Sequence, residues 1–395
     1  MTKVNPPKIS VIIATYNYGH FIHEAIKSVF DQTYQDFEII VVDDGSTDET
    51  QAIIQTFADP RLRYIYQENA GQAIALNTGI RNCMGEYVAF LDADDYFLPH
   101  RLEDHVKTFD ERPEVGLAAS GVVYINEVGQ VTGEKRPWEG IPQLDLETWL
   151  FECPTVPSAI SVRRNWLEKM GGFDESLPCA IDYNLWVRLA YAGCTSVWVK
   201  SLVCAYRIHS NNMTKNTVAF RNGTISALDK FYAMPNLPDR LVALQSQLYS
   251  NTYLRSACQE YANGLVELAR QDMERAVKLD PALLESQGQR IFEMILMWAP
   301  SPRTGDPIAY IKTIFENLPD TTEVLRQRVH EAIKVAAMDT FYQAYRDYDW
   351  PRLRRAFVTA GLNRPTLFLN RGILSIVIES FFGSQFINQV RRIVP

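Results

Sequence analysis

The chain has 395 residues, of which 47% are hydrophobic and 22% charged, a composition typical of a soluble globular protein with two or three domains. Lys and Arg number 39 against 47 Asp and Glu, and the resulting net charge of −8 argues against a nucleic-acid-binding surface. The six cysteines show no CxxC spacing, the N-terminus lacks a signal-peptide h-region, and no apolar run reaches the roughly 18–20 residues of a membrane span. We therefore expect a cytoplasmic protein with reduced thiols.

Strands and helices alternate regularly over the first quarter of the chain. The β-branched run ISVIIA predicts a buried strand at 9–14, and apolar residues at helical spacing follow it at 21–30. The pattern continues with strands expected at 37–44, 61–68 and 86–95 and helices at 45–58 and 71–85. This alternation predicts a parallel, doubly wound α/β sheet of the Rossmann-like type, whose ligands bind beyond the carboxyl ends of the strands.

The middle of the chain has less regular signals, and strand signals end near Asn216. The expected elements are a strand at 115–123, a polar, Gly-rich excursion to Ile141, a helical turn and a strand within 146–164, a short helix within 165–177, an amphipathic helix at 181–193, and one bent strand or two strands at 195–209. Helical periodicity then runs almost to the end. We place a boundary at 215–240, between an α/β domain (1–225) and an all-α domain (240–395).

The helical half contains a weak internal repeat. Ala269, Met273, Ala276 and Pro281 follow the small-large-small-Pro rhythm of a tetratricopeptide unit. A fainter echo at 357–365 lies 84 residues further on, which is not a multiple of the 34-residue unit. Tetratricopeptide-like repeats and generic helix pairs both remain open, and either one offers a surface for a protein partner.

The last segment, GILSIVIESFFGSQFINQVRRI, is apolar with basic residues at its end. It is either a helix that caps the core or an interfacial helix that contacts a membrane peripherally.

Three carboxylates, Asp92, Asp94 and Asp95, follow the expected strand that ends in FLDADD. Like charges this close raise one another's pKa unless a cation or a set of donors compensates them. The cluster therefore indicates either a divalent metal site or the cap of a helix that begins at LPHRL.

Four motifs, ISVIIATYN, EIIVVDDGSTDET, AFLDADD and CAIDYNLWVRLA, resemble the family 2 glycosyltransferases in order and spacing. The resemblance covers about residues 7–212 and implies an inverting transferase with a nucleotide-diphospho-sugar-binding sheet of the glycosyltransferase A type. The combination of VDDGSTD and a downstream DxD is more specific than either motif alone. The helical half lies outside the resemblance.

The resemblance implies a metal, Mn²⁺ or Mg²⁺, held by oxygen ligands at the DxD motif. Such a cation would neutralise the charge that grows on a departing nucleoside diphosphate. Asp94 is the first candidate ligand and Asp95 a second, while Asp92 would contact the ribose or a metal-bound water. His209, in RIHSNNMT, is a third candidate ligand or a phosphate donor, and Arg207 would approach the diphosphate; a lone His is more often structural.

A nucleotide-sugar donor, most readily a UDP-sugar, is implied by the first two motifs. Asp44 would accept the imide N–H of uracil and Asp43 would read the base or ribose. Ala14, Thr15 and Tyr16 would form the wall of the base site. Gln72, together with Asn77, lies where the family contacts the donor, although polar residues of a packed helix fit these two positions nearly as well. DDGST is also ordinary turn and helix-cap chemistry.

Asp182, in AIDYNLW, occupies the family's catalytic base position, from which a carboxylate would remove the proton of the acceptor hydroxyl. Ile181 replaces the first acid of the usual acidic pair. The alternative is that Asp182 only caps the helix that follows it.

We therefore expect an enzyme that moves a single sugar from a nucleotide-sugar to a hydroxyl of a glycan or of a lipid-linked acceptor, in polysaccharide or glycolipid synthesis. The chain contains no QxxRW element of the kind that processive synthases of this family carry. A lipid-linked acceptor would place the protein at the inner face of a membrane. A nucleotidyltransferase on a similar sheet is an alternative, but ATYNYGH is not a Gly-rich phosphate loop with Lys or Arg. The other alternative is a non-catalytic scaffold whose helical half binds a partner.

Overall fold

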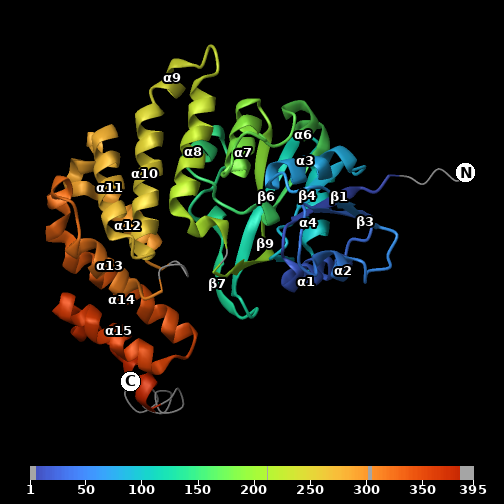
Figure 1. The fold of residues 1–395 in the computed structure, drawn as a ribbon. Coiled ribbons are helices and arrows are strands. Elements are labelled where there is room, and N and C mark those ends of the chain that lie inside the picture. The colour runs from blue at the N-terminus through green and yellow to red at the C-terminus, as the bar shows by residue number, and fades with distance from the viewer. Residues whose placement is uncertain (1–5, 211, 301–304, 383–395) are drawn as a thin grey trace, which may run out of the picture. The chain divides into compact units, whose positions relative to one another are not determined.

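The computed structural model describes residues 6–210, 212–300 and 305–382, and its contacts divide the chain into the units Met1–Val242 and Ala243–Pro395. The first unit is built on one mixed sheet with the strand order β3-β2-β1-β4-β8-β6-β9-β5, and β7 pairs with β6 (Figure 1). The strands are β1 Ile9–Thr15, β2 Phe37–Asp43, β3 Leu62–Tyr66, β4 Tyr87–Phe90, β5 Tyr96–Phe97, β6 Val115–Asn126, β7 Val131–Lys135, β8 Ile160–Arg163 and β9 Thr195–Ile208.

The four N-terminal strands confirm the expected parallel arrangement, since β1 pairs in parallel with both β2 and β4, and β2 with β3. The sheet as a whole is mixed because β8 lies antiparallel between β4 and β6. β9 then runs parallel to β6 as one long irregular strand. Together with the helices on both faces, this is the α/β fold class that the sequence predicted.

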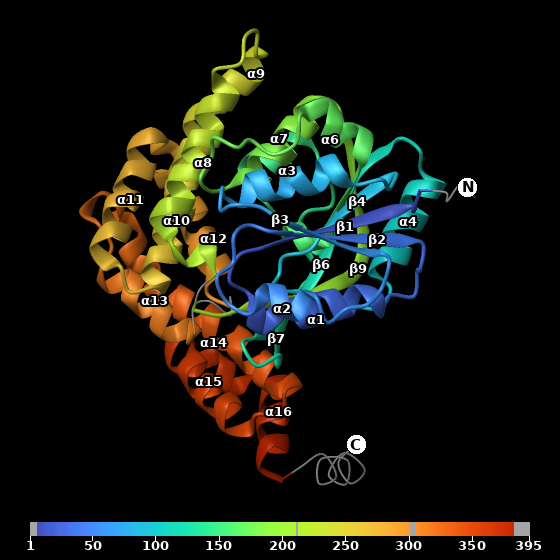
Figure 2. The same ribbon diagram turned by 45° about the vertical axis from the view of Figure 1, so that its right-hand side comes forward.

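Helices cover both faces of this sheet (Figure 2). α1 (Gly19–Phe30) and α4 (Arg101–Glu111) share one apolar cluster with alternate residues of β1 and β2. α3 (Gln72–Asn82), α6 (Arg164–Met170) and α7 (Ile181–Tyr191) lie on the opposite face. The period-2 alternation of β1 explains both layers: Ile9, Val11 and Ile13 face the first cluster, while Ile12 lies against Gly79 of α3.

Two expected elements differ from the structure. The helix expected at 45–58 is reduced to α2 (Thr50–Ile54), because the residues before it bond to the loop after β1: Asn17 Oδ1 accepts from the Thr47 N–H (2.7 Å) and Asp48 Oδ2 from the Gly19 N–H (3.0 Å). The polar excursion to Ile141 contains β7, which forms a hairpin with β6.

The first unit also contains α5 (Leu146–Phe151), α8 (Thr217–Tyr232) and α9 (Asp239–Val242). Both α5 and α8 pack against α7, so the α/β unit continues past residue 225, where the sequence placed its end.

The second unit is helical in its described residues. Its helices are α10 Gln245–Ala262, α11 Val266–Leu279, α12 Glu285–Trp298, α13 Pro307–Glu316, α14 Val329–Arg346, α15 Trp350–Asn363 and α16 Arg371–Phe382. Two apolar clusters hold them together. α14 contributes Ala332, Ile333 and Ala336 to the first cluster and Phe341 and Ala344 to the second.

The faint sequence repeat corresponds to two matched helical hairpins. α10 and α11 have 18 and 14 residues, and so do α14 and α15, which begin and end 84 residues later. The connections match as well, since Gly264 (φ 75°) and Tyr348 (φ 56°) both adopt the left-handed conformation 84 residues apart. We call these the first hairpin (α10–α11) and the second hairpin (α14–α15). No helix in the described ranges is both long and apolar enough to cross a bilayer.

Candidate active site

The polar residues singled out in the sequence gather at the carboxyl ends of β1, β2 and β4. The strand register brings Thr15 opposite Asp43, and Asp43 opposite Tyr66, so the three strands end at one edge. β4 ends at Phe90, and the acidic loop Asp92–Asp95 follows it at the same edge. These polar residues therefore lie at the carboxyl edge of the sheet, where the sequence predicted a ligand site.

Asp43 is fully buried and both of its carboxylate oxygens have partners inside the fold. Oδ1 accepts from the Ser46 N–H (2.8 Å) and Oδ2 accepts from the Tyr64 hydroxyl (2.8 Å). Asp43 thus fixes the turn that presents Asp44. Gly45 serves the same turn: its φ is 83°, and a Cβ there would come within 2.7 Å of the Asn69 backbone nitrogen.

Asp44 holds the loop before α3. It accepts hydrogen bonds from Gln67 Nε2 (2.7 Å) and from the backbone N–H groups of Ala70 (2.9 Å) and Gly71 (2.8 Å). A carboxylate can accept about four hydrogen bonds, so roughly one position remains for a ligand. Gln72 follows as the exposed first residue of α3.

Thr15 contributes an unusual group to the same edge. Its side chain is 3% exposed, and its Oγ1 atom has no hydrogen-bond partner among the described residues. A buried hydroxyl without a partner costs free energy, and a ligand that bonded to it would recover that cost. Beside it, Ala14 is half-buried and Tyr16 is 47% exposed, so the aromatic side chain of Tyr16 is accessible at this edge of the sheet.

Within the acidic loop, Asp95 turns into the fold. It is 1% exposed, its Oδ1 accepts from the Arg207 N–H (2.9 Å), and its Oδ2 accepts from the Ser158 hydroxyl (2.7 Å). The same Ser158 oxygen accepts from the Asp92 N–H (3.1 Å), so the 3-10 turn Pro157–Ala159, which precedes β8, anchors the loop. The expected role of Asp95 as a second metal ligand does not match this geometry, because both of its oxygens are already engaged in the interior.

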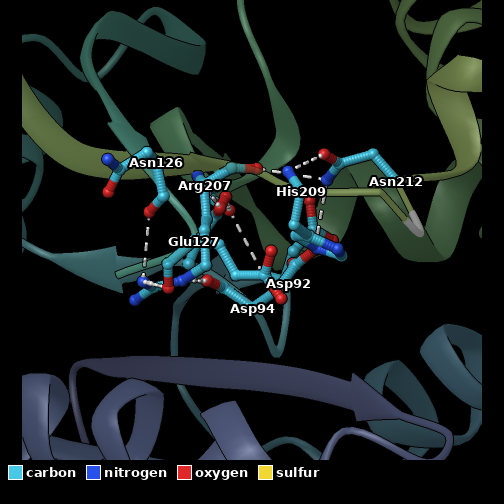
Figure 3. Close-up of polar contacts among 9 residues, drawn as sticks. Asp92, Asp94, Asn126, Glu127, Arg207, His209 and Asn212 are labelled. Carbon is cyan, nitrogen blue, oxygen red and sulfur yellow. Dashed lines mark hydrogen bonds and ion pairs between the residues drawn. The ribbon is translucent and has the colours of Figure 1, made fainter. Parts of the chain in front are cut away.

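Asp94 turns the other way, toward His209. Asp94 Oδ2 lies 2.8 Å from His209 Nε2, and Asn212 Nδ2 donates more weakly to the same oxygen (3.4 Å). Asn212 also fixes the chain of His209, whose N–H donates to Asn212 Oδ1 (2.7 Å) (Figure 3). The His209 ring packs 5.3 Å from the ring of Phe21. A carboxylate oxygen and an imidazole nitrogen thus lie in direct contact with each other.

This pair suits a divalent cation that leaves positions open for a substrate. Asn, His and Asp side chains are ligands that Mn²⁺ accepts, and Mg²⁺ is usually held by one or two carboxylates together with substrate phosphates. Across the described ranges, no three His, Cys, Asp or Glu side chains are gathered to hold a metal by themselves. The remaining ligands would therefore have to come from a bound phosphate or from water.

Arg207 cross-links the acidic loop instead of facing the crevice. Nε donates to the Asp94 carbonyl oxygen (2.8 Å), Nη1 donates to the Glu127 carbonyl oxygen (3.0 Å), and Nη2 forms an ion pair with Glu24 of α1. Figure 3 shows it between the Asp94 loop and the turn at Asn126 and Glu127. The expectation that Arg207 approaches a diphosphate is therefore corrected, since its guanidinium is committed and its side chain is only 3% exposed.

Asp182 is the second residue of α7, and Ala180, which precedes this helix, is in the left-handed conformation (φ 54°). The pKa of Asp182 is raised, and burial is the main cause. Hydrogen bonds from the backbone N–H groups of Tyr183 and of Asp182 itself lower this pKa but do not cancel the effect of burial. Burial, and then the charges of Asp94 and Asp182, raise the pKa of Asp92. Asp92 therefore lies within electrostatic range of both Asp94 and Asp182. Ile181, at the position of the missing acid, is buried.

Among other residues near the site, the sequence left the role of Asn77 open and did not single out three more. Asn77 is structural, because its Nδ2 donates to the Phe173 carbonyl (2.9 Å) and its Oδ1 accepts from the Phe173 N–H (2.8 Å). Ser158 and Asn212 were missed, although Asn212 belongs to the RIHSNNMT segment that was examined for His209. Tyr18 was missed as well: its ring lies 6.1 Å from the ring of His209, and burial, followed by the charges of Asp94 and Asp92, raises its pKa.

Comparisons with known proteins agree with this geometry. A family model described as Glycosyl transferase family 2 matches residues 10–171. An uncharacterized glycosyltransferase of Nostoc sp. is 35% identical over 218 residues, which cover 52% of this chain and 66% of the relative. One from Haemophilus influenzae is 32% identical over 219 residues, covering 52% and 67%. The chain spans about half to two thirds of the length of most of the curated relatives that it matches.

Solved structures show the same fold at low identity. Residues 1–349 of S. aureus TarS in complex with UDP align with a TM-score of 0.53 at 19% identity, over 81% of this chain and 91% of that chain. A mannosyltransferase from Pyrobaculum calidifontis in complex with GDP-Man and Mn²⁺ aligns with a TM-score of 0.52 at 21% identity, over 79% and 87%.

Proposed function

Because this chain belongs to the family 2 glycosyltransferases, we propose that it transfers one sugar from a nucleotide-sugar, most readily a UDP-sugar, to a hydroxyl of a glycan or a lipid-linked glycan, with inversion at the sugar carbon. The observation that carries the proposal is the Asp94–His209 pair, because Asp94 follows β4 at the carboxyl edge of the sheet, where β1 also ends with the unpartnered Thr15 hydroxyl.

Asp44 and Thr15 bind the base of the donor. Asp44 uses its remaining acceptor position for a base N–H, such as the imide of uracil, and Thr15 gains the hydrogen bond that it lacks in the free protein. The exposed ring of Tyr16 covers the base, and Ala14 and Gln72 border the donor.

Asp94 and His209 hold a divalent cation, Mn²⁺ or Mg²⁺, next to the diphosphate. When bound, the cation offsets the negative charge that grows on the leaving diphosphate. Asp95, Ser158 and Arg207 keep Asp94 turned toward His209, so that the pair is in position before the donor arrives. Asp92 remains the candidate contact for the ribose.

Asp182 is the general base. Its carboxylate takes the proton of the acceptor hydroxyl while the acceptor oxygen bonds to the anomeric carbon and the bond from that carbon to the phosphate oxygen breaks, with its electron pair leaving on the diphosphate. A single displacement of this kind inverts the anomeric configuration. The raised pKa of Asp182 makes the carboxylate a stronger base than an exposed Asp.

A thermal-shift panel of nucleotide-sugars tests this function. UDP- and GDP-sugars are each added with Mn²⁺ or with a chelator, and one donor should raise the melting temperature only when metal is present. The selected donor is then incubated with candidate hydroxyl acceptors, and the anomeric configuration of the product is read by NMR. Retention of configuration, or donor binding that is unaffected by the chelator, would contradict the mechanism.

A further inference from the structure

The second hairpin and α16 carry an exposed surface that combines apolar and basic side chains. Leu369 is 80% exposed, Leu362 74% and Val358 50%. Arg355, Val358 and Leu362 share one face of α15, since they are spaced by three and four residues. Phe368 packs on the ring of Phe357 and covers Gly361, which brings Leu369 close to this face.

The charge of this region is opposite to that of the whole protein. Residues 350–382 contain five arginines and one carboxylate, Glu379, in a chain whose net charge is −8. Arg355 and Arg371 are exposed, and neither is paired with a carboxylate in the described part of the chain. We call Arg355, Val358, Leu362, Leu369 and Arg371 the basic apolar patch.

The first hairpin shows that the fold does not require such a surface. Three of the patch positions lie in α15, and the residues 84 positions before them, Gln271, Glu274 and Lys278 of α11, are all exposed. The two hairpins have the same helix lengths and the same connection, so equivalent surface positions are polar in one copy and largely apolar or basic in the other. The difference therefore points to a ligand of the second hairpin.

We infer that the basic apolar patch docks the protein on an anionic membrane surface. Arginine beside leucine and valine is the composition of interfacial helices, whose apolar side chains enter the headgroup region while the guanidinium groups meet lipid phosphates. An acidic protein as a whole would be repelled by anionic lipid, so a local basic patch also fixes which face approaches the bilayer. Residues 383–395, which follow α16 in the sequence, add two arginines and no carboxylate.

Vesicle flotation tests the inference with the full chain. The protein should float with phosphatidylcholine vesicles that contain phosphatidylglycerol, float far less with pure phosphatidylcholine, and lose binding as salt is raised. The variant Arg355→Gln with Arg371→Gln should bind about 30-fold more weakly, at roughly fivefold per arginine. A second variant, Val358→Glu with Leu362→Lys and Leu369→Glu, places the first hairpin's residues at the two α15 positions and a charge at Leu369, and it should abolish flotation while helicity is retained.

The first hairpin supplies the matched control, because Gln271→Ala changes the exposed position equivalent to Arg355 and should leave flotation unchanged. Equal flotation of wild type and both patch variants would overturn the inference. So would a wild type that fails to float but forms a dimer that the patch variants dissolve, since the occupant would then be a second copy. Transfer to a water-soluble acceptor is a separate readout: the patch variants should keep it, and its absence in the wild type would count against the proposed function alone.

Discussion

Nε2 of His209 lies 2.8 Å from Oδ2 of Asp94, although the two residues are far apart in the chain. If they hold the cation, Asp94→Asn and His209→Gln should each weaken Mn²⁺ binding in the presence of UDP by at least about 10-fold and reduce kcat by on the order of 100-fold. Titration of Mn²⁺ followed by EPR measures the affinity directly. His100 and Glu103 form an exposed pair of the same kind (3.2 Å), so His100→Gln with Glu103→Gln is the matched control and should behave as wild type.

Asp182→Asn should reduce kcat by about 10²–10⁴-fold and leave donor affinity close to that of the wild type, because only the proton acceptor is lost. Calorimetry with UDP and Mn²⁺ and product quantification separate the two effects. Glu147, an exposed carboxylate in the first turn of α5, provides the control Glu147→Gln, which should remain fully active. An unchanged kcat in the Asp182→Asn variant would show that Asp182 is not the general base.

The pH profile follows from the burial of Asp182. Burial raises its pKa, and the base works only when ionised, so kcat/KM should rise with pH through a value above the usual pKa of about 3.9 and then level off. The same pKa shift also changes the free energy of unfolding with pH. A carboxyl whose pKa is raised in the folded state stabilises the fold when it is protonated, and this contribution is lost as pH rises through that pKa. Asp182→Asn should therefore melt at a higher temperature than wild type at neutral pH. A profile that stays flat to pH 4 in folded protein would contradict this.

Arg207 should act on the metal site through position. Arg207→Lys loses the planar set of donors that reaches the Asp94 carbonyl, the Glu127 carbonyl and Glu24 together, and we expect Mn²⁺ affinity and kcat to fall in parallel. The free energy of unfolding should also fall, by about 3 kcal/mol, because buried partners are left unpaired. Glu24→Gln keeps the backbone contacts and should have a smaller effect. An increase in donor KM with unchanged metal affinity would instead indicate a direct diphosphate contact.

Thr15→Val should separate binding from stability. The hydroxyl has no partner in the described protein, so its removal should leave the free energy of unfolding unchanged or slightly higher, while UDP affinity falls about 3- to 10-fold if the base uses it. Thr217 in α8 has a second buried hydroxyl without a partner among the described residues. Thr217→Val is the control, and it should leave UDP affinity unchanged in calorimetry.

Hydrophobic periodicity predicted the α/β sheet because β1 to β4 and their helices each bury a face. Hydrophobic periodicity did not predict β7. Its residues are half-buried or exposed on an edge hairpin, and for this reason its sequence VTGEK does not alternate between apolar and polar residues. The helix after Asp44 was predicted too long because Asn17 and Gly19 bind its first residues as a loop. Exposure on the sheet edge explains the first case, and contacts between segments about 30 residues apart explain the second.

The candidate site was predictable to the level of motifs but not of side-chain direction. Asp94 and Asp95 are neighbours in the sequence with equal claims to a metal, yet one faces His209 and the other is bonded to Ser158 and Arg207. Arg207 looked like a phosphate ligand because its partners, Glu24 and Glu127, lie about 180 and 80 residues away in the sequence. Such choices depend on tertiary packing that no local pattern encodes.

Helix α14 joins two apolar clusters that are otherwise formed by different helices. Amide exchange should therefore divide this single helix, with slower exchange around Ala332 to Ala336 than around Phe341 to Ala344 whenever the terminal cluster opens by itself. Substitutions in α15 and α16 can therefore change the surface of these helices without unfolding the first half of α14, which packs in the other cluster.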